Sequence, residues 1–231
     1  MTARMVHAPR LPGLEPVACT PEQRRTAHMV LSVLLDYPSE KVGPALDAAE
    51  QSLPGLPGPV GADVAEFLDW ARRVGPRAVA EHYVDTFDQR RRCALYLSYY
   101  AVGDTRQRGA AILGFKAVVR ALGFEQVRDE LADYLPLTLE LSALTGDPLV
   151  LDLLASHREG IEVMRSALRG YRSPYAHLLD ALCRTLPAVD AATYERYQRL
   201  VTQGPPAEMV GTSSAFAATA PFTLTDGSAR S

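Results

Sequence analysis

Apolar residues recur at three- and four-residue spacing along most of the chain, which is the pattern of amphipathic helices. The first such run follows Thr20-Pro21-Glu22-Gln23, where a threonine cap, a proline in the first turn and a glutamine three residues after the cap are typical of a helix start. It is expected to end at Tyr37-Pro38, because proline keeps the residue before it out of helical geometry. The pattern predicts a helix over residues 20–36.

The remaining apolar runs predict a series of further helices. Residues 53–60, with three prolines and two glycines, are expected to form a loop between two of them. Leu95, Leu97 and Tyr99 alternate as in a strand, but no second strand candidate lies nearby in the sequence, so a helix is expected there too. The predicted helices cover residues 39–51, 63–74, 76–87, 95–100, 104–122, 134–144, 148–169, 173–186 and 190–201.

These helices predict an all-α protein, a single-domain helical bundle with flexible termini. The helical domain is expected over residues 20–202, after a flexible N-terminal segment at 1–19. From residue 203 to residue 231, glycine, proline, serine and alanine are frequent, which predicts a mobile tail.

Composition and charge narrow the function classes. With 231 residues, 47% of them hydrophobic and 22% charged, the chain has the averages of a globular protein. Its net charge of -3 provides no positive potential for nucleic acid, so no nucleic-acid partner is expected. No run approaches the roughly 20 apolar residues of a membrane helix, so no direct membrane insertion is expected. The three cysteines stand alone without a CxxC spacing, which favours reduced thiols and a cytoplasmic location.

Motifs of catalysis and metal binding are missing from the sequence. It contains no GxxxxGK(S/T), GxGxxG, HExxH or GxSxG, and its five histidines never stand four apart as a metal pair on one helix. The chain is therefore not expected to be an enzyme, and no metal or other cofactor is expected. His157, on the apolar face of its helix, is interpreted as a core histidine. Glu130 and Asp133 could form the carboxylate pair of an enzyme without a cofactor. The favoured interpretation is that they are a helix cap and a solvated charge.

One segment combines aromatic, basic and acidic side chains at high density. It runs from residue 83 to residue 109 and reads YVDTFDQRRRCALYLSYYAVGDTRQRG, in a chain whose aromatic content is only 7%. Arg106 and Arg108 fall in the first turn of the helix that Asp104 is expected to cap, where the helix dipole disfavours positive charge by about 0.3 to 1 kcal/mol each. Some other interaction is expected to offset this cost.

Two interpretations of this segment stay open. In one, the arginines form ion pairs with Asp85, Asp88 or Asp104 and fix a loop. In the other, tyrosines and arginines line a groove, because these residue types are enriched where proteins bind peptides. The arginine run at 90–92 is more often a solvated face than a site. The two tyrosines at 99–100 are explained as readily by packing as by contacts with a partner.

A longer part of the chain resembles a known family. YVDTFDQRRRCALYLSYYAVGDTRQRGAAILGFKAVVRALGFE, followed by DELADYLPLTLEL, is similar to the NarJ family of nitrate reductase molybdenum cofactor assembly chaperones. LLDYPSE near the start fits the same family, and the resemblance covers roughly residues 25–144. The family usually reads ELPDHLP where this chain has ELADYLP at 130–136, so no role of a histidine is expected there.

The resemblance implies both a fold and a client protein. Members of the family are helical bundles related to the wider TorD-like chaperones. They bind the apo form of the catalytic alpha subunit of respiratory nitrate reductase at its N-terminal segment. Binding keeps that subunit competent for insertion of the molybdenum cofactor, and by implication of an iron-sulfur cluster, before it docks to the membrane subunit. Molybdenum cofactor biosynthesis proteins are further implied partners.

The resemblance and the aromatic segment together predict the client-binding residues. An amphipathic client peptide is expected in an apolar groove between helices, with Tyr99, Phe115 and Leu135 as its wall. Charged side chains at 88, 104, 106 and 108 are expected at the rim. The full expected set is Tyr83, Thr86, Phe87, Asp88, Leu95, Tyr99, Tyr100, Asp104, Arg106, Arg108, Phe115, Asp133, Tyr134, Leu135 and Glu140.

A protein of another class is the alternative. A small helical ligand-binding regulator would combine a similar bundle with a DNA-reading segment near its start. Such a segment needs a basic recognition helix, whereas residues 20–36 offer only Arg24 and Arg25. The sequence therefore favours the chaperone.

Overall fold

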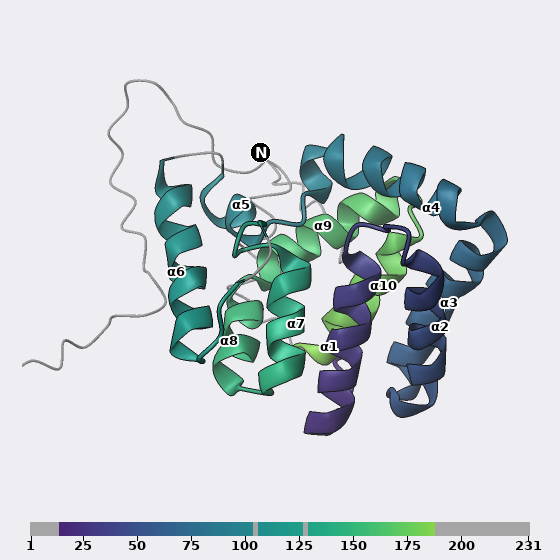
Figure 1. Cartoon of the computed structure of the whole chain (residues 1–231), viewed down its shortest axis with the longest axis horizontal. Coiled ribbons are helices and arrows are strands. Elements are labelled where there is room, and N and C mark those ends of the chain that lie inside the picture. Colours follow the sequence, from purple (N-terminus) through teal and green to yellow (C-terminus); the bar gives the residue numbers. More distant parts are fainter. Residues whose placement is uncertain (1–13, 104–105, 127–128, 188–231) are drawn as a thin grey trace, which may run out of the picture.

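Helices make up the regular structure of the part of the chain that the computed structural model describes, residues 14–103, 106–126 and 129–187 (Figure 1). The predicted all-α class is confirmed. Asp104, the predicted helix at 190–201, the mobile tail and most of the flexible N-terminal segment lie outside the described residues. The helices are α1 (Pro21–Leu35), α2 (Val42–Ser52), α3 (Gly58–Val74), α4 (Pro76–Tyr83), α5 (Leu97–Val102), α6 (Gln107–Ala121), α7 (Leu135–Thr145), α8 (Pro148–Ser156), α9 (Arg158–Gly170) and α10 (Tyr175–Thr185), with the short helical turns η1 (Leu53–Gly55), η2 (Val84–Asp88) and η3 (Arg91–Cys93).

Local sequence signals determine several helix ends. The Thr20 hydroxyl accepts a hydrogen bond from the Gln23 amide (3.1 Å), and the Gln23 side chain accepts one from the Thr20 amide (3.0 Å). Gly123 follows α6 with φ 78°, and Gly146 follows α7 with φ 63°, conformations that favour a residue without a Cβ. The predicted start of the first helix and the predicted stop at Gly123 are confirmed.

The prediction of one helix over residues 148–169 is wrong. Two helices, α8 and α9, meet at His157, whose backbone leaves helical geometry at φ -98° and ψ 11°. The ring of His157 donates a hydrogen bond from Nδ1 to the Leu153 carbonyl (2.9 Å) and so occupies an acceptor at the end of α8. Apolar residues keep their spacing across the break, so the periodicity alone does not reveal it.

Three other boundaries also differ from the prediction. The expected loop at 53–60 is shorter, because α3 already begins at Gly58. The helix expected over 76–87 ends as α4 at Tyr83 and continues as the π-helical turn η2. Leu95 and Tyr96 are not helical, and the backbone of Tyr96 is extended. Tyr96 forms an isolated antiparallel bridge with Tyr134. No strand partner was found near Tyr96 in the sequence because its partner lies far along the chain.

α10 is the central helix of the bundle. It packs against α1, α3 and α9, and its buried residues include Leu178, Leu179, Leu182 and Cys183. α7 packs along α1, while α6 lies at the edge of the molecule opposite to α2, α3 and α4 (Figure 1). The buried side chains form one core, which holds α7 in place from the inside.

A buried histidine joins three of these helices. His28 of α1 is fully buried, with Nδ1 2.8 Å from the Ser142 hydroxyl of α7 and Nε2 3.0 Å from the Thr185 hydroxyl of α10. Burial, with a smaller effect of the Arg24 charge, lowers the pKa of His28 from 6.5 to about 3. The ring is therefore neutral in the folded protein at neutral and mildly acidic pH.

We expect His28 to make the protein less stable in acid. Between pH 6.5 and about 3 the unfolded chain binds a proton at His28 that the folded chain does not bind, so stability is lost as the pH falls below 6.5. In His28→Gln, the drop in the free energy of unfolding between about pH 7 and about pH 4.5 should be smaller by about 2 kcal/mol. Urea denaturation of both proteins at both pH values measures it, and equal drops would contradict the prediction.

Charged side chains are buried between α9 and α10. Glu162 accepts hydrogen bonds from Arg158 (2.9 Å) and Arg165 (2.7 Å), and Asp180 accepts them from Arg165 (3.1 Å) and Arg169 (2.5 Å). Except for Arg169, these side chains are at most 7% exposed. Each buried charge in the network thus has an opposite charge beside it, as burial requires.

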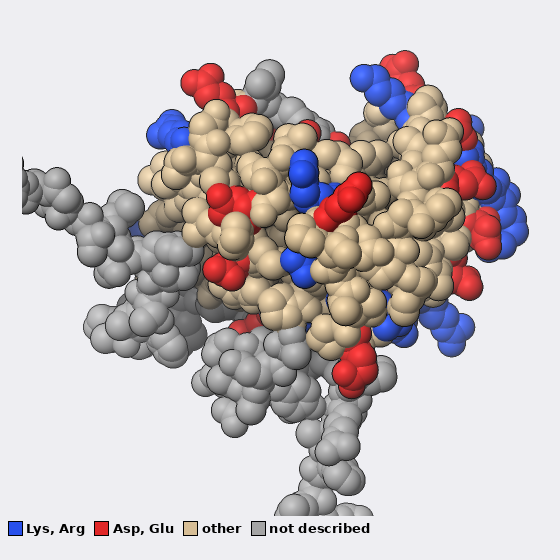
Figure 2. Space-filling view, turned by 90° about the horizontal axis from the view of Figure 1, so that it is seen from below, with Lys and Arg blue, Asp and Glu red and all other residues tan. Residues whose placement is uncertain are grey.

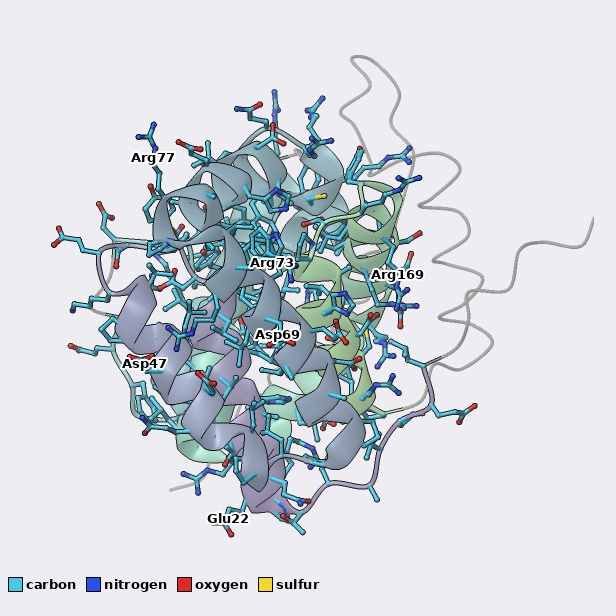
Figure 3. All side chains as sticks on the ribbon, turned by 90° about the vertical axis from the view of Figure 1, so that its right-hand side faces the viewer. Glu22, Asp47, Asp69, Arg73, Arg77 and Arg169 are labelled. Atoms are coloured by element: carbon cyan, nitrogen blue, oxygen red, sulfur yellow. The ribbon has the colours of Figure 1, made fainter. Side chains whose placement is uncertain are left out.

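Solvent-facing charges cover the outer side of α2 and α3. Asp47, Asp69 and Arg73 point outward on this side (Figure 3), and Arg72 forms ion pairs with Asp47 and Glu50. Among the helices of the described residues, none has both the length and the apolar character to cross a membrane. In the view from below, charged side chains gather toward the α2 and α3 side, and much of the remaining described surface is uncharged (Figure 2).

Candidate functional site: an apolar groove

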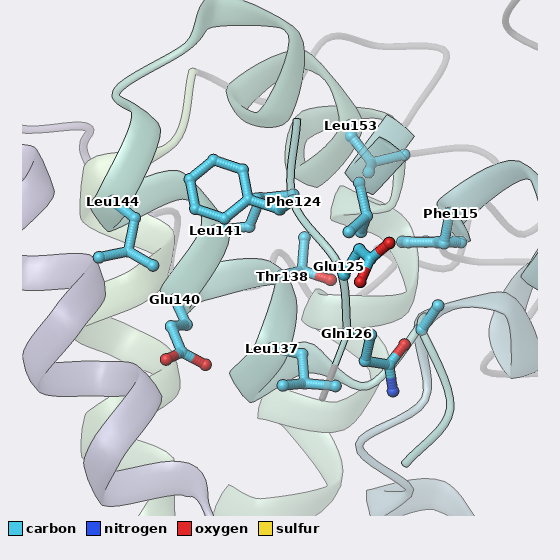
Figure 4. A pocket seen from close by; sticks show the side chains of 12 residues that line it. Phe115, Phe124, Glu125, Gln126, Leu137, Thr138, Glu140, Leu141, Leu144 and Leu153 are labelled. Atoms are coloured by element: carbon cyan, nitrogen blue, oxygen red, sulfur yellow. The ribbon is translucent and has the colours of Figure 1, made fainter. Parts of the chain in front are cut away.

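A hollow of about 200 Å³ opens between α6, α7, α8 and the turn after α6, and we call it the α6–α7 groove (Figure 4). Most of its lining is apolar. The lining residues are Phe115, Val119, Phe124, Glu125, Gln126, Ala132, Leu137, Thr138, Glu140, Leu141, Leu144 and Leu153.

α7 forms one wall of the groove because it carries leucines on more than one side. Leu135 and Leu139 are fully buried in the core. Leu137, Leu141 and Leu144, at positions i, i+4 and i+7, line the groove instead. A helix with apolar residues all round needs cover on every side. Here the cover is partial, and 47% of Leu144 stays exposed.

α6 forms the opposite wall and buries little of its own surface. Phe115 is its buried side chain, with its ring centroid 5.1 Å from that of His157. Phe124, the residue after the left-handed Gly123, borders the groove and is 37% exposed. Exposed aromatic and aliphatic side chains gathered in one place are typical of interaction sites.

Carboxylates predominate at the edge of the groove. Glu125 and Glu140 are among its lining residues. A neighbouring hollow adds two more carboxylates and two cations, Asp129, Glu130, Lys116 and Arg120. An apolar floor with carboxylates at its edge suits an apolar helix that carries lysine or arginine beside its apolar face.

The segment between α6 and α7 is held by polar contacts with α5. The Tyr96 hydroxyl donates a hydrogen bond to Glu130 Oε1 (3.1 Å), and the buried carboxylate of Asp133 accepts bonds from the Ser98 hydroxyl (2.5 Å) and amide (3.2 Å). Burial and the Glu130 charge raise the pKa of Tyr96 to about 12, so its hydroxyl keeps the proton that it donates. Glu130 and Asp133 were interpreted as a helix cap and a solvated charge. Asp133 is fully buried, so the interpretation as a solvated charge is wrong for this residue.

The structure divides the predicted client-binding residues into three groups. Phe115 and Glu140 line the groove. Asp88 and Arg106 are exposed elsewhere, Tyr99 and Arg108 are half-buried, and Asp104 lies outside the described residues. The others are buried in the interior: Tyr83, Thr86, Phe87, Leu95, Tyr100, Asp133, Tyr134 and Leu135.

The buried group holds the fold together. The hydroxyls of Tyr83 and Tyr134 are 2.8 Å apart. The ring of Phe87 packs against the rings of Tyr83 and Tyr175, with centroid distances of 4.7 Å and 4.9 Å. The Tyr100 hydroxyl donates hydrogen bonds to two backbone carbonyls of the segment before α5. Leu135, expected in the wall of the groove, faces the core and is fully buried. These side chains support the site from behind, and contact of the exposed ones with a client stays a prediction.

The arginine-rich segment has internal partners. Arg90 forms an ion pair with Asp85 (2.8 Å), and its guanidinium lies 4.3 Å from the Tyr171 ring centroid. The Arg108 guanidinium lies 5.5 Å from the centroid of the Tyr96 ring. The interpretation in which arginines form ion pairs and fix a loop therefore applies to Arg90. This residue belongs to the run at 90–92, which was expected to be a solvated face.

Of the twelve residues that line the groove, the sequence predicted Phe115 and Glu140 and missed ten, among them Leu137, Leu141, Leu144 and Phe124. Leucines at helical spacing are usually assigned to a core. The signal that distinguishes them is the distribution of leucine around the whole of α7, because one core cannot cover all of its sides.

His157, predicted to be a core histidine, is half-buried beside Phe115; its Nδ1 is bonded to the Leu153 carbonyl, and burial lowers its pKa. Asp63, His177 and Asp180 place one ligand atom each within 4.8 Å of one another. Arginines already neutralise both carboxylates, because Arg184 pairs with Asp63 (2.7 Å) and Arg165 and Arg169 pair with Asp180. The charge balance of this group does not favour a metal ion.

The N-terminal helix does not have the features of a DNA-reading element. α1 is packed in the bundle, and Arg25 donates hydrogen bonds to the carbonyls of Ala143 (2.7 Å) and Leu144 (3.3 Å) at the end of α7. The side chain that a recognition helix would turn toward bases is engaged within the protein.

Fold and groove define the class of protein: an all-helical protein with an open apolar groove edged by carboxylates. Residues 53–181 match the family model described as nitrate reductase delta subunit, and the chain belongs to this family. The predicted resemblance to the NarJ family is thereby confirmed.

Two kinds of relative are similar to this chain. The nitrate reductase-like protein NarX of Mycobacterium tuberculosis is 38% identical over 154 residues, which are 67% of this chain and 23% of NarX. The chain thus spans less than a quarter of that relative. The "probable nitrate reductase molybdenum cofactor assembly chaperone NarJ" of Bacillus subtilis is 29% identical over 164 residues, 71% of this chain and 89% of the relative. The description of that relative as a chaperone agrees with the prediction that the chain is not an enzyme.

Proposed function

We propose that this chain is an assembly chaperone for respiratory nitrate reductase. It binds the apo catalytic alpha subunit by that subunit's N-terminal segment and keeps it competent for molybdenum cofactor insertion before docking to the membrane subunit. Membership of the delta subunit family and the name of the B. subtilis relative support the assembly role. The observation that carries the binding role is the apolar lining of the α6–α7 groove, in which Leu144 of α7 and Phe124 keep 47% and 37% of their surfaces exposed.

The shape of the groove favours a helical client. The groove of about 200 Å³ has room for side chains of a client, with Leu144 (47% exposed) and Phe124 (37% exposed) at its open side and Leu141 (8% exposed) in its floor. A client helix that crosses α7 presents apolar residues at i, i+3 or i+4 on one face and can insert them there. Each leucine or phenylalanine that the client buries there contributes about 1.5 to 3 kcal/mol.

The proposal predicts that Leu144→Gln weakens binding of the client peptide about tenfold. The substitution removes an exposed apolar contact and inserts an amide that must be desolvated on binding, a loss of about 1.4 kcal/mol. Calorimetric titration with a synthetic peptide of the alpha subunit's N-terminal segment measures it.

The matched control is Leu113→Gln. Leu113 is 65% exposed on α6 and does not line the groove, so this variant should bind the peptide as the wild type does. Thermal unfolding checks that both variants are folded. Equal affinity of both variants and the wild type would remove the α6–α7 groove as the binding site.

The proposal includes a cytoplasmic location, where the apo subunit is available, and contact with molybdenum cofactor biosynthesis proteins during cofactor insertion. The chaperone needs no cofactor of its own for this role, since it holds the client and leaves the chemistry of insertion to those partners.

A further inference from the structure

A second hollow lies on the other side of the α1 and α7 pair. It has a volume of about 230 Å³ and opens between α1, the turn after α1, and α2, and we call it the α1–α2 hollow. Val33 and Tyr37 line it and keep 43% and 54% of their surfaces exposed. It is similar in size to the α6–α7 groove, and its apolar side chains lie beside the polar residues Ser32, Asp36, Ser39 and Lys41.

The two hollows meet at one residue. Glu140 lines both of them. α1 and α7 run antiparallel, because Ser32 donates a hydrogen bond to the Pro136 carbonyl (2.8 Å) while His28 is bonded to Ser142 (2.8 Å). The outer faces of the two helices are thus neighbours, and Glu140 extends from α7 on the side toward α1 (Figure 4).

A positive charge beside Glu140 would stabilise its carboxylate when a client binds. The Glu140 side chain is half-buried between the two hollows, and Lys41, which also lines the α1–α2 hollow, forms no ion pair with it among the described residues. Within the ranges that the structure describes, its carboxylate has no hydrogen bond or ion pair. A carboxylate that loses water on binding needs a partner, and a lysine or arginine from the bound segment would form a charge-assisted hydrogen bond with it.

We infer that one client segment occupies both hollows and places a basic residue over Glu140. This inference rests on the proposed function and extends it to the form of the client. The path from one hollow to the other crosses α7 and α1, two helix spacings of about 8 to 10 Å each. A helix covers that distance in about 11 to 13 residues at 1.5 Å per residue. The client is therefore an amphipathic helix of at least this length, with an apolar cluster near each end and a lysine or arginine between them.

The test compares two valines. Val33→Gln changes the α1–α2 hollow, and Val74→Gln makes the same change at an exposed valine of α3 that lines neither hollow. In calorimetric titrations with a peptide of the alpha subunit's first 20 or so residues, Val33→Gln should weaken binding about tenfold and Val74→Gln should have no effect.

Glu140→Gln supplies the second arm. It should weaken binding of the same peptide about tenfold. In this variant, replacing the peptide's central basic residue by glutamine should have little further effect on binding, because the two changes remove one interaction. Additive losses would place the basic residue elsewhere and overturn the assignment of Glu140.

The outcomes separate this inference from the proposed function. If Leu144→Gln weakens binding and Val33→Gln does not, the client uses the α6–α7 groove alone, and the inference is wrong while the proposed function stands. If neither variant weakens binding, the inference is wrong and the client binds outside both hollows. Failure of the wild-type protein to bind the peptide at all would contradict the proposed function.

Discussion

Gly160→Ala is expected to lower the free energy of unfolding by about 2 kcal/mol, because there is no room for a methyl group at this position of α9. A Cβ on Gly160 would lie 2.6 Å from Cβ and 2.8 Å from Cγ of Tyr100. These atoms are at the base of a side chain that is 2% exposed and whose hydroxyl is bonded to the carbonyls of Arg92 and Ala94. Tyr100 therefore cannot move aside without breaking these contacts.

Gly114→Ala is the matched control, since it places the same methyl group in α6 with no atom within 4 Å. Alanine is the better helix former, so this variant should be more stable than the wild type by about 0.5 to 1 kcal/mol. Urea denaturation of both variants measures the difference. Changes of the same sign would show that the contact of α9 with Tyr100 is not as close as described.

Glu162→Ala is expected to cost about 3 to 5 kcal/mol of stability, because it leaves two buried guanidinium groups without their shared carboxylate. Burial alone would raise the pKa of Glu162, but the charges of Arg165 and Arg158 outweigh it and hold the pKa below its usual value. The carboxylate is therefore ionised when the protein is folded at neutral pH. Chemical denaturation at that pH measures the loss.

An exposed ion pair provides the comparison. Glu81 pairs with Arg77 one turn away on α4, with both side chains largely in solvent. Glu81→Ala should leave the free energy of unfolding almost unchanged, because water already solvates both charges. A loss in Glu162→Ala as small as that in Glu81→Ala would contradict the role given to the buried network.

Local signals made much of the fold predictable. The start of α1 depends on hydrogen bonds within four residues of sequence, so Thr20 and Gln23 were sufficient to place it. The break between α8 and α9 at His157 could not be predicted in this way, because the spacing of apolar residues continues through it. The pairing of Tyr96 with Tyr134 joins segments far apart in sequence, which no local pattern contains.

The candidate site was harder to predict than the fold. Residue type does not reveal the direction of a side chain, and a tyrosine or aspartate can be buried wherever a hydrogen-bond partner exists. Tyr83 finds such a partner in Tyr134, and Asp133 finds one in Ser98, so residues expected at a surface are inside. The leucines of α7 that line the groove were overlooked for the converse reason, because leucine at helical spacing indicates a core in most helices.

The weak anchoring of α6 has a consequence for how a bound segment is let go. Phe115 is the one buried side chain of this helix, and Ile112 and Val118 pack only partly against the core, so less apolar area is exposed to water when α6 moves away than when a central helix such as α10 does. Such local opening costs much less than global unfolding and exchanges on a faster timescale. A cleft with one wall of this kind can release its occupant by moving that wall, while α1, α3, α9 and α10 stay packed.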